Sequence, residues 1–133
     1  APEPLQIGRD ILEKLDAAGM TYDVTGDFES VIPTVDAIYM TRIQDEWDKA
    51  DGSAPVDVSR FCLTADHLKI LQQHAIIMHP LPRRHEIAPE VDADPRAKYW
   101  RQVRNGMWVR AVLILMIFDR DHEIDRYYDD LMS

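Results

Sequence analysis

The 133-residue sequence contains only one cysteine, Cys62. A single cysteine excludes a disulfide framework and a zinc site built from cysteines. It also fits a reducing compartment, so we expect the protein in the cytoplasm or inside an organelle. The sequence has no hydrophobic run long enough to cross a membrane, because the most apolar stretch, residues 107–118, is short and contains Arg110.

Basic residues are also scarce: 15 Lys and Arg stand against 24 Asp and Glu, which gives a net charge of −9. This balance argues against non-specific nucleic-acid binding, which depends on neutralising phosphates. Local arginines can still bind a small anion. The five histidines match no familiar zinc spacing, and the sequence has no G-x-S-x-G, P-loop or G-x-G-x-x-G motif. We therefore expect no metal and no cofactor.

Apolar residues make up 46% of the chain, enough for one domain with a core. Apolar periodicity predicts helices over residues 7–18, around 28–32, over 64–73 and over 96–118. β-Forming residues predict strands at 20–24, 36–41 and 75–78. Helices that alternate with strands predict an α/β fold, here a small three-stranded parallel sheet flanked by helices. The polar segment 42–57 is interpreted as a long mobile loop.

Several residues mark the ends of these helices. Gly19 is in the position of a C-terminal stop, and Asp27 is a candidate N-cap. Thr64 or Asp66 is expected to open the third helix, and Asn105-Gly106 to bend or interrupt the last one. Residues 107–118 of that last helix are apolar nearly all round, which predicts burial on more than one side.

Polar side chains follow the strand at 36–41, and ligands in parallel α/β sheets bind beyond the carboxyl ends of the strands. Arg42, Gln44 and Glu46 alternate, so an extended chain presents them on one side. The Arg42 guanidinium fork suits a carboxylate, Gln44 can donate and accept, and Glu46 could hold Arg42 in place. A solvated loop with one weak surface salt bridge explains the same spacing.

A proline-rich turn follows the strand at 75–78. Pro82 is expected to restrict Leu81 to an extended or polyproline conformation, which fixes the direction of the Leu81 carbonyl. Such a carbonyl can accept a bond from an amino or amide group of a ligand, although composition alone favours a rigid corner without a ligand. Arg83, Arg84 and His85 add positive charge beside the turn, either for an anion or as a plain surface cluster.

Taken together, the ordered segments resemble one family, the catalytic chains of aspartate carbamoyltransferases. The resemblance covers about residues 1–120 and favours the aspartate branch over the ornithine branch, because Pro80 follows His79. It implies a Rossmann-like carbamoyltransferase domain with a long C-terminal helix. The segments that carry it are DAIYMTRIQ at 36–44, MHPLPR at 78–83, Glu86-Ile87, Asp92, AKYWRQ at 97–102 and Asn105-Gly106.

The resemblance also implies roles for individual residues. Arg42 would grip a carboxylate of L-aspartate and Gln44 would orient the substrate, while Glu46 and Glu86 would brace Arg42. Backbone carbonyls at Pro80–Leu81 would bind the amino group of aspartate and the amide of carbamoyl phosphate, with Arg83 supporting the turn. The reaction would be carbamoyl transfer to L-aspartate, the pyrimidine-biosynthesis step that gives N-carbamoyl-L-aspartate.

The sequence departs from the family in lacking its first domain, which carries the phosphate cradle. We therefore expect an incomplete L-aspartate-binding domain at 1–94, a helix at 95–118 that would return to the missing N-terminal half, and an acidic tail at 119–133. Asp45 and Trp47 also depart from the usual loop. No catalytic residue is expected on this chain alone, so it should be inactive by itself.

Two other functions fit the same sequence. The chain could be a non-catalytic accessory or structural subunit derived from such an enzyme, or a free-standing binder of small dicarboxylates. Whether the chain is part of an enzyme or a structural subunit, we expect a protein partner chain or a homo-oligomer, since the apolar helix needs to be covered.

Overall fold

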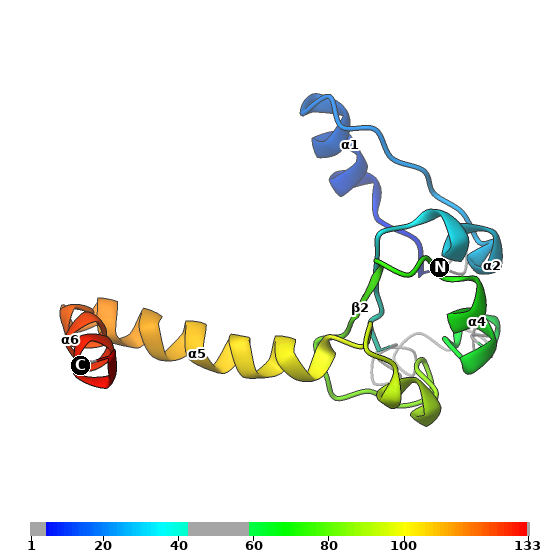
Figure 1. The fold of residues 1–133 in the computed structure, drawn as a ribbon. Helices are drawn as coiled ribbons and strands as arrows, with labels where there is room; N and C mark the ends of the chain where they lie inside the picture. Colours follow the sequence, from blue (N-terminus) through cyan, green and yellow to red (C-terminus); the bar gives the residue numbers. More distant parts are fainter. Residues whose placement is uncertain (1–4, 43–58, 133) are drawn as a thin grey trace.

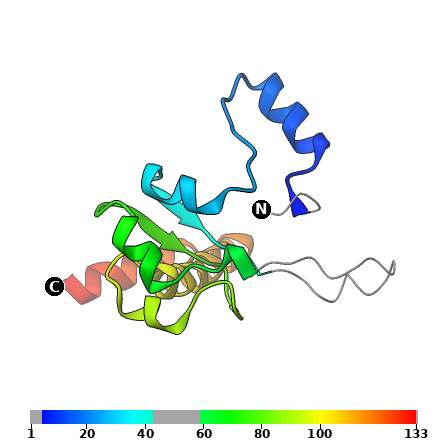
Figure 2. The same cartoon turned by 90° about the vertical axis from the view of Figure 1, so that its right-hand side faces the viewer.

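The computed structural model describes residues 5–42 and 59–132. A small α/β body carries a short helix, α1, that stands apart from it in both views, and a long helix, α5, that projects away from it in a different direction (Figures 1 and 2). The elements are α1 (Arg9–Ala17), α2 (Phe28–Val31), β1 (Ala37–Tyr39), α4 (Ala65–Ile70), β2 (Ile76–Met78), α5 (Tyr99–Ile117) and α6 (His122–Met132), with 3-10 turns at Ile32–Thr34, Ser59–Phe61 and Pro89–Ala93.

The sheet of the described residues has two strands, β1 and β2, which pair in parallel. Ile38 lies beside Ile77 in the register, and the Met40 N–H donates to the Met78 carbonyl at 3.0 Å beyond the last pair. The strands predicted at residues 36–41 and 75–78 are thus confirmed. Because they run parallel, their carboxyl ends meet at one edge of the sheet.

The predicted third strand, at residues 20–24, is wrong. That segment has no regular structure, and Met20, Tyr22 and Val24 are all exposed. The free side of β2 is used by a different segment, since the Ile77 N–H donates to the Arg96 carbonyl and the Lys98 N–H donates to the Ile77 carbonyl, both at 2.8 Å. Alternating β-formers predicted a strand, but the segment packs against no part of the core, and β-propensity alone does not make a strand.

The core of the body is compact and lies around the sheet. Ile38 and Ile77 contribute from the two strands, and Tyr99 contributes from the first turn of α5. The remaining buried apolar residues are Ile32, Met40, Leu63, Leu71, Ala75, Ile87 and Val91. None of the residues of α1 is buried, so α1 adds nothing to this core.

The helix-end predictions are confirmed at three positions. Gly19 adopts φ +66°, and its N–H donates to the Asp16 carbonyl at 3.0 Å, which ends α1. The Asp27 carboxylate caps α2 by accepting from the Ser30 N–H at 3.2 Å. Thr64 opens α4 in a reciprocal cap with His67, whose Nδ1 accepts from the Thr64 N–H at 3.0 Å.

The long helix α5 is continuous through Asn105-Gly106, so the predicted interruption is wrong. One glycine inside a helix costs only about 1 kcal/mol, which the surrounding helix formers offset. Its apolar side chains are exposed over most of its length, so the described residues do not supply the burial that the all-round apolar pattern predicts. The exposed ones are Trp100, Val103, Met107, Trp108, Val109, Leu113, Ile114, Met116 and Ile117, followed by Phe118.

The predicted acidic tail, residues 119–133, is mostly helical. Asp119 turns the chain with φ +56°, and α6 follows at the far end of α5 (Figure 1). Glu123 and Asp125 in its first turn suit the positive end of a helix dipole. No helix in the described part of the chain is long and apolar enough to cross a bilayer.

Candidate functional site

The candidate site lies where β1 and β2 end at the same edge of the sheet. β1 leads through Met40 and Thr41 to the half-buried Arg42, and β2 leads directly into the turn that begins at His79. The structure therefore brings the Arg42 segment and the proline turn to one edge, as predicted. Gln44 and Glu46 lie outside the described residues, so their predicted roles stay predictions.

The turn after β2 differs from its predicted form. Leu81 has φ +52°, not an extended conformation, and the Leu81–Pro82 peptide bond is cis. The Leu81 N–H folds back and donates to His79 Nδ1 at 2.8 Å. A positive φ is unfavourable for a leucine, so the surrounding contacts must hold the turn. The Leu81 conformation therefore differs from the one that Pro82 alone predicts, and it occurs together with the hydrogen bond to His79.

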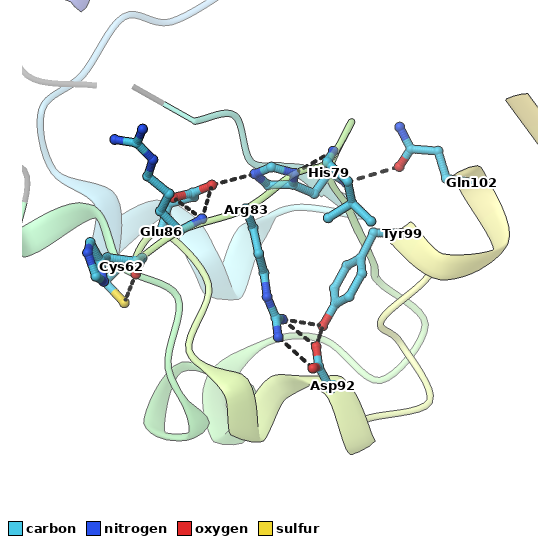
Figure 3. A network of polar contacts seen from close by, with 10 residues as sticks. Cys62, His79, Arg83, Glu86, Asp92, Tyr99 and Gln102 are labelled. Atoms are coloured by element: carbon cyan, nitrogen blue, oxygen red, sulfur yellow. Dashed lines mark hydrogen bonds and ion pairs between the residues drawn. The ribbon is translucent and has the colours of Figure 1, made fainter. Parts of the chain in front are cut away.

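His79 is fully buried and is the centre of the site (Figure 3). Its Nδ1 accepts the Leu81 N–H, so this nitrogen carries no proton. Its Nε2 lies 2.7 Å from Glu86 Oε1 and must be the protonated nitrogen that donates to the carboxylate. The imidazole is therefore neutral, with one defined tautomer, and joins the turn to Glu86.

Glu86 is held as a carboxylate. Burial acts to raise its pKa, but backbone N–H donors, including that of Arg84, and the His79 ring outweigh burial and lower it. The Arg84 N–H lies 3.2 Å from each Glu86 oxygen. Glu86 thus places a fixed negative charge beside the turn. Its predicted role in bracing Arg42 stays a prediction.

Gln102, from the first turns of α5, joins both strand ends to the long helix. Its Oε1 accepts the His79 backbone N–H at 3.0 Å, and its Nε2 donates to the Tyr39 hydroxyl at 2.9 Å. Tyr39 is the last residue of β1, so one side-chain amide connects β1, α5 and the residue that follows β2. Figure 3 shows Gln102 reaching the His79 backbone from the helix.

Arg83 points away from His79 toward a second polar group (Figure 3). Its guanidinium forms a two-point ion pair with Asp92, with Nη2 and Oδ2 2.5 Å apart, and Nη1 donates to the Tyr99 hydroxyl at 3.2 Å. The Tyr99 hydroxyl also donates to Asp92. The hydrogen bonds from Arg83 lower the pKa of Asp92, and burial with Asp92 raises the pKa of Tyr99 to about 12. Asp92 therefore neutralises the Arg83 charge, and the ion pair holds together the two parts of the loop that carry these residues.

The sequence interpretation did not assign roles to His79 or Gln102. The signal for His79 was its position directly after a buried strand, with a carboxylate seven residues later. Gln102 gave no local signal, because its bonds to His79 and Tyr39 span 23 and 63 residues. No group of three or more potential metal ligands occurs among residues 5–42 and 59–132.

Comparison with known proteins identifies similar sequences and structures. Residues 1–117 match the family model of the aspartate/ornithine carbamoyltransferase Asp/Orn binding domain. The aspartate carbamoyltransferase catalytic subunit of Vibrio cholerae is 42% identical over 120 residues, which cover 90% of this chain and 38% of that subunit. The corresponding subunit of Chromobacterium violaceum is 40% identical over the same length, covering 90% of this chain and 39% of its own.

Solved structures agree with the sequence matches. Aspartate transcarbamoylase from Trypanosoma cruzi in complex with carbamoyl phosphate superposes with a TM-score of 0.73 at 33% identity, covering 86% of this chain and 38% of that one. The chain thus spans well under half the length of the relatives that it matches.

Proposed function

Because the chain belongs to the family of aspartate/ornithine carbamoyltransferase Asp/Orn binding domains, we propose that it supplies the L-aspartate-binding half of an aspartate carbamoyltransferase. The product of the complete enzyme is N-carbamoyl-L-aspartate. Carbamoyl phosphate would be held by residues outside these 133, in keeping with the share of the relatives that the chain spans.

One observation carries the proposal: Arg42 and the Pro80–Leu81 turn leave two parallel, paired strands at the same edge. An amino acid with a side-chain carboxylate needs a cation and, a few ångströms away, carbonyl acceptors for its amine. Arg42 offers the guanidinium fork, and the turn offers the carbonyls. The aspartate complexes of the Trypanosoma cruzi enzyme are the matching precedent among similar structures.

The chemistry requires little from this half beyond position and charge. The aspartate amine attacks the carbamoyl carbon, the new C–N bond forms, the C–O bond to phosphate breaks, and the amine proton leaves with the phosphate. Carbonyl acceptors at the turn would orient the amine, and Arg42 would fix the far carboxylate. Holding the two reactants close together in the right orientation supplies much of the rate acceleration in such reactions.

Arg42→Ala tests the proposal in an assembly that contains the carbamoyl-phosphate-binding half. Losing a charge-assisted contact to a carboxylate costs about 1.5–3 kcal/mol, so kcat/KM for aspartate should fall about ten-fold to a hundred-fold. The KM for carbamoyl phosphate should stay nearly unchanged. Arg42→Lys should rescue poorly, because an ammonium lacks the fork.

Arg9→Ala is the matched control, because Arg9 is an exposed arginine on α1. It should leave both substrate dependences unchanged. An Arg42→Ala enzyme with unaltered aspartate dependence would contradict the proposal.

The second candidate is a non-catalytic subunit derived from the same family. Two observations favour it: α5 exposes apolar side chains along its length, and α6 lies beyond the family match that ends at residue 117. In that case the chain would assemble with other proteins through α5 and α6, and Arg42→Ala would leave the assembly and its activity unaffected.

A further inference from the structure

The buried imidazole of His79 has a role that the proposed chemistry does not yet use. We propose that His79 is a positioning residue: its Nδ1, by accepting the Leu81 N–H, aims the Pro80 carbonyl at the amine of the bound amino acid. The inference rests on the proposed function for the identity of that amine. The geometry of the turn itself stands on the structure.

The peptide bond between Pro80 and Leu81 links the buried side of the turn to its other side. This bond is trans, so its N–H and C=O point in opposite directions. The Leu81 N–H points at His79 Nδ1, 2.8 Å away. The Pro80 carbonyl must therefore point away from the imidazole. One hydrogen bond on the buried side of the turn sets the direction of the acceptor on its other side.

The position of the proton on the His79 ring decides whether Nδ1 can accept the Leu81 N–H. Nδ1 accepts only while it is unprotonated, so the aim depends on the tautomer with hydrogen on Nε2. Glu86 fixes that tautomer, because its carboxylate has no proton to give and accepts from Nε2 at 2.7 Å. The two contacts of the ring thus have separate purposes: one selects the tautomer and the other orients the peptide.

The His79 ring does more than fill space in the core. The backbone of His79 is anchored independently, because its N–H is bonded to Gln102 Oε1 at 3.0 Å. Leu81 meanwhile has φ +52°, which a leucine does not adopt without support. The strand end would stay in place without the imidazole, but the peptide after Pro80 would lose the contact that orients it.

Two substitutions divide the functions of the ring. His79→Asn keeps an acceptor near the Nδ1 position, because an Asn side-chain oxygen readily accepts the N–H two residues later. His79→Gln keeps a donor near the Nε2 position that can reach Glu86 and offers no acceptor at Nδ1. In the assembled enzyme, His79→Asn should retain kcat/KM for aspartate to within about three-fold, and His79→Gln should lose about ten-fold or more. Carbamoyl phosphate binding should be unaffected in both.

A spectroscopic measurement on the unsubstituted protein keeps the inference testable if a variant fails to fold. Nitrogen NMR of the His79 ring should show a protonated Nε2 and an unprotonated Nδ1, and the Leu81 amide should be protected from hydrogen exchange. A ring protonated on Nδ1, or an unprotected Leu81 amide, would overturn the inference whatever the kinetics.

The kinetic outcomes separate the inference from the function on which it rests. If Arg42→Ala impairs aspartate use but His79→Gln performs as well as His79→Asn, the inference fails and the proposed function stands. If Arg42→Ala has no effect on aspartate use, the proposed function fails, and the assignment of the Pro80 carbonyl to a substrate amine fails with it.

Discussion

Arg96 holds the end of α4 to the segment that borders β2, and its removal should destabilise the protein strongly. Its Nη1 donates to the Leu71 carbonyl at 2.7 Å, its Nη2 donates to the Leu68 carbonyl at 2.8 Å, and the same group pairs with Asp94 at 2.8 Å. The side chains of Arg96 and Asp94 are only 15% and 14% exposed. Arg96→Ala would leave carbonyls at a helix C-terminus without a cation and a nearly buried carboxylate without its partner.

The expected cost follows from these contacts. Breaking a fully buried pair by removing one partner costs 3–5 kcal/mol, and the residual exposure here places the loss near the lower end, about 3 kcal/mol. Small domains are stable by about 5–15 kcal/mol, so this is a large share. With a urea slope of about 2 kcal/mol/M, the unfolding midpoint should fall by about 1.5 M.

The assay is urea unfolding of the purified protein, followed by tryptophan fluorescence and circular dichroism. Arg101→Ala is the matched control, since Arg101 is an exposed arginine on α5. It should change the free energy of unfolding by less than about 0.5 kcal/mol. Arg96→Lys should recover only part of the loss, because one ammonium cannot serve the carbonyls and Asp94 together. A loss below about 1 kcal/mol for Arg96→Ala would refute the reasoning.

Three further predictions concern stability. The pKa of Asp92 is lowered in the folded state. Its contribution to stability is therefore present above the unfolded pKa near 3.8 and is lost as the pH falls through the folded pKa. Asp92→Asn should make the free energy of unfolding depend less on pH in that acid range. Tyr99, with a pKa of about 12 against 10.0 unfolded, should lose its contribution as the pH rises from 10.0 to about 12, and Tyr99→Phe should remove this alkaline slope in pH-dependent urea titrations. Asp27→Ala removes the N-cap of α2 and should cost about 1 kcal/mol in thermal unfolding, whereas Asp23→Ala, in the exposed segment before it, should be neutral.

The sequence predicted the parts of the fold that depend on local chemistry. Apolar continuity identified β1 and β2, and single side chains at Gly19, Asp27 and Thr64 marked helix ends correctly. The segment 20–24, wrongly predicted as a strand, has β-forming residues but is exposed and irregular in the structure. The outer side of β2 is bonded instead to Arg96 and Lys98, a pairing that depends on long-range packing.

The candidate site was likewise only partly predictable from the sequence. Its location was predictable, because parallel strands place their carboxyl ends together and the turn after β2 carries two prolines. Its internal geometry was not, since Leu81 has a positive φ with its N–H bonded to the His79 ring, and that ring is in turn bonded to Glu86. A proline restricts the preceding residue, but a buried hydrogen bond can override the local preference.

The most direct test of the account is the formation of N-carbamoyl-L-aspartate by this chain mixed with the remaining portion of a similar catalytic subunit, such as that of Vibrio cholerae. Each piece alone is the control, and light scattering establishes whether the two associate. The account predicts that the associated pieces form product from carbamoyl phosphate and L-aspartate, that neither piece does so alone, and that Arg42→Ala abolishes most of the gain. A stable complex that forms no product would contradict it.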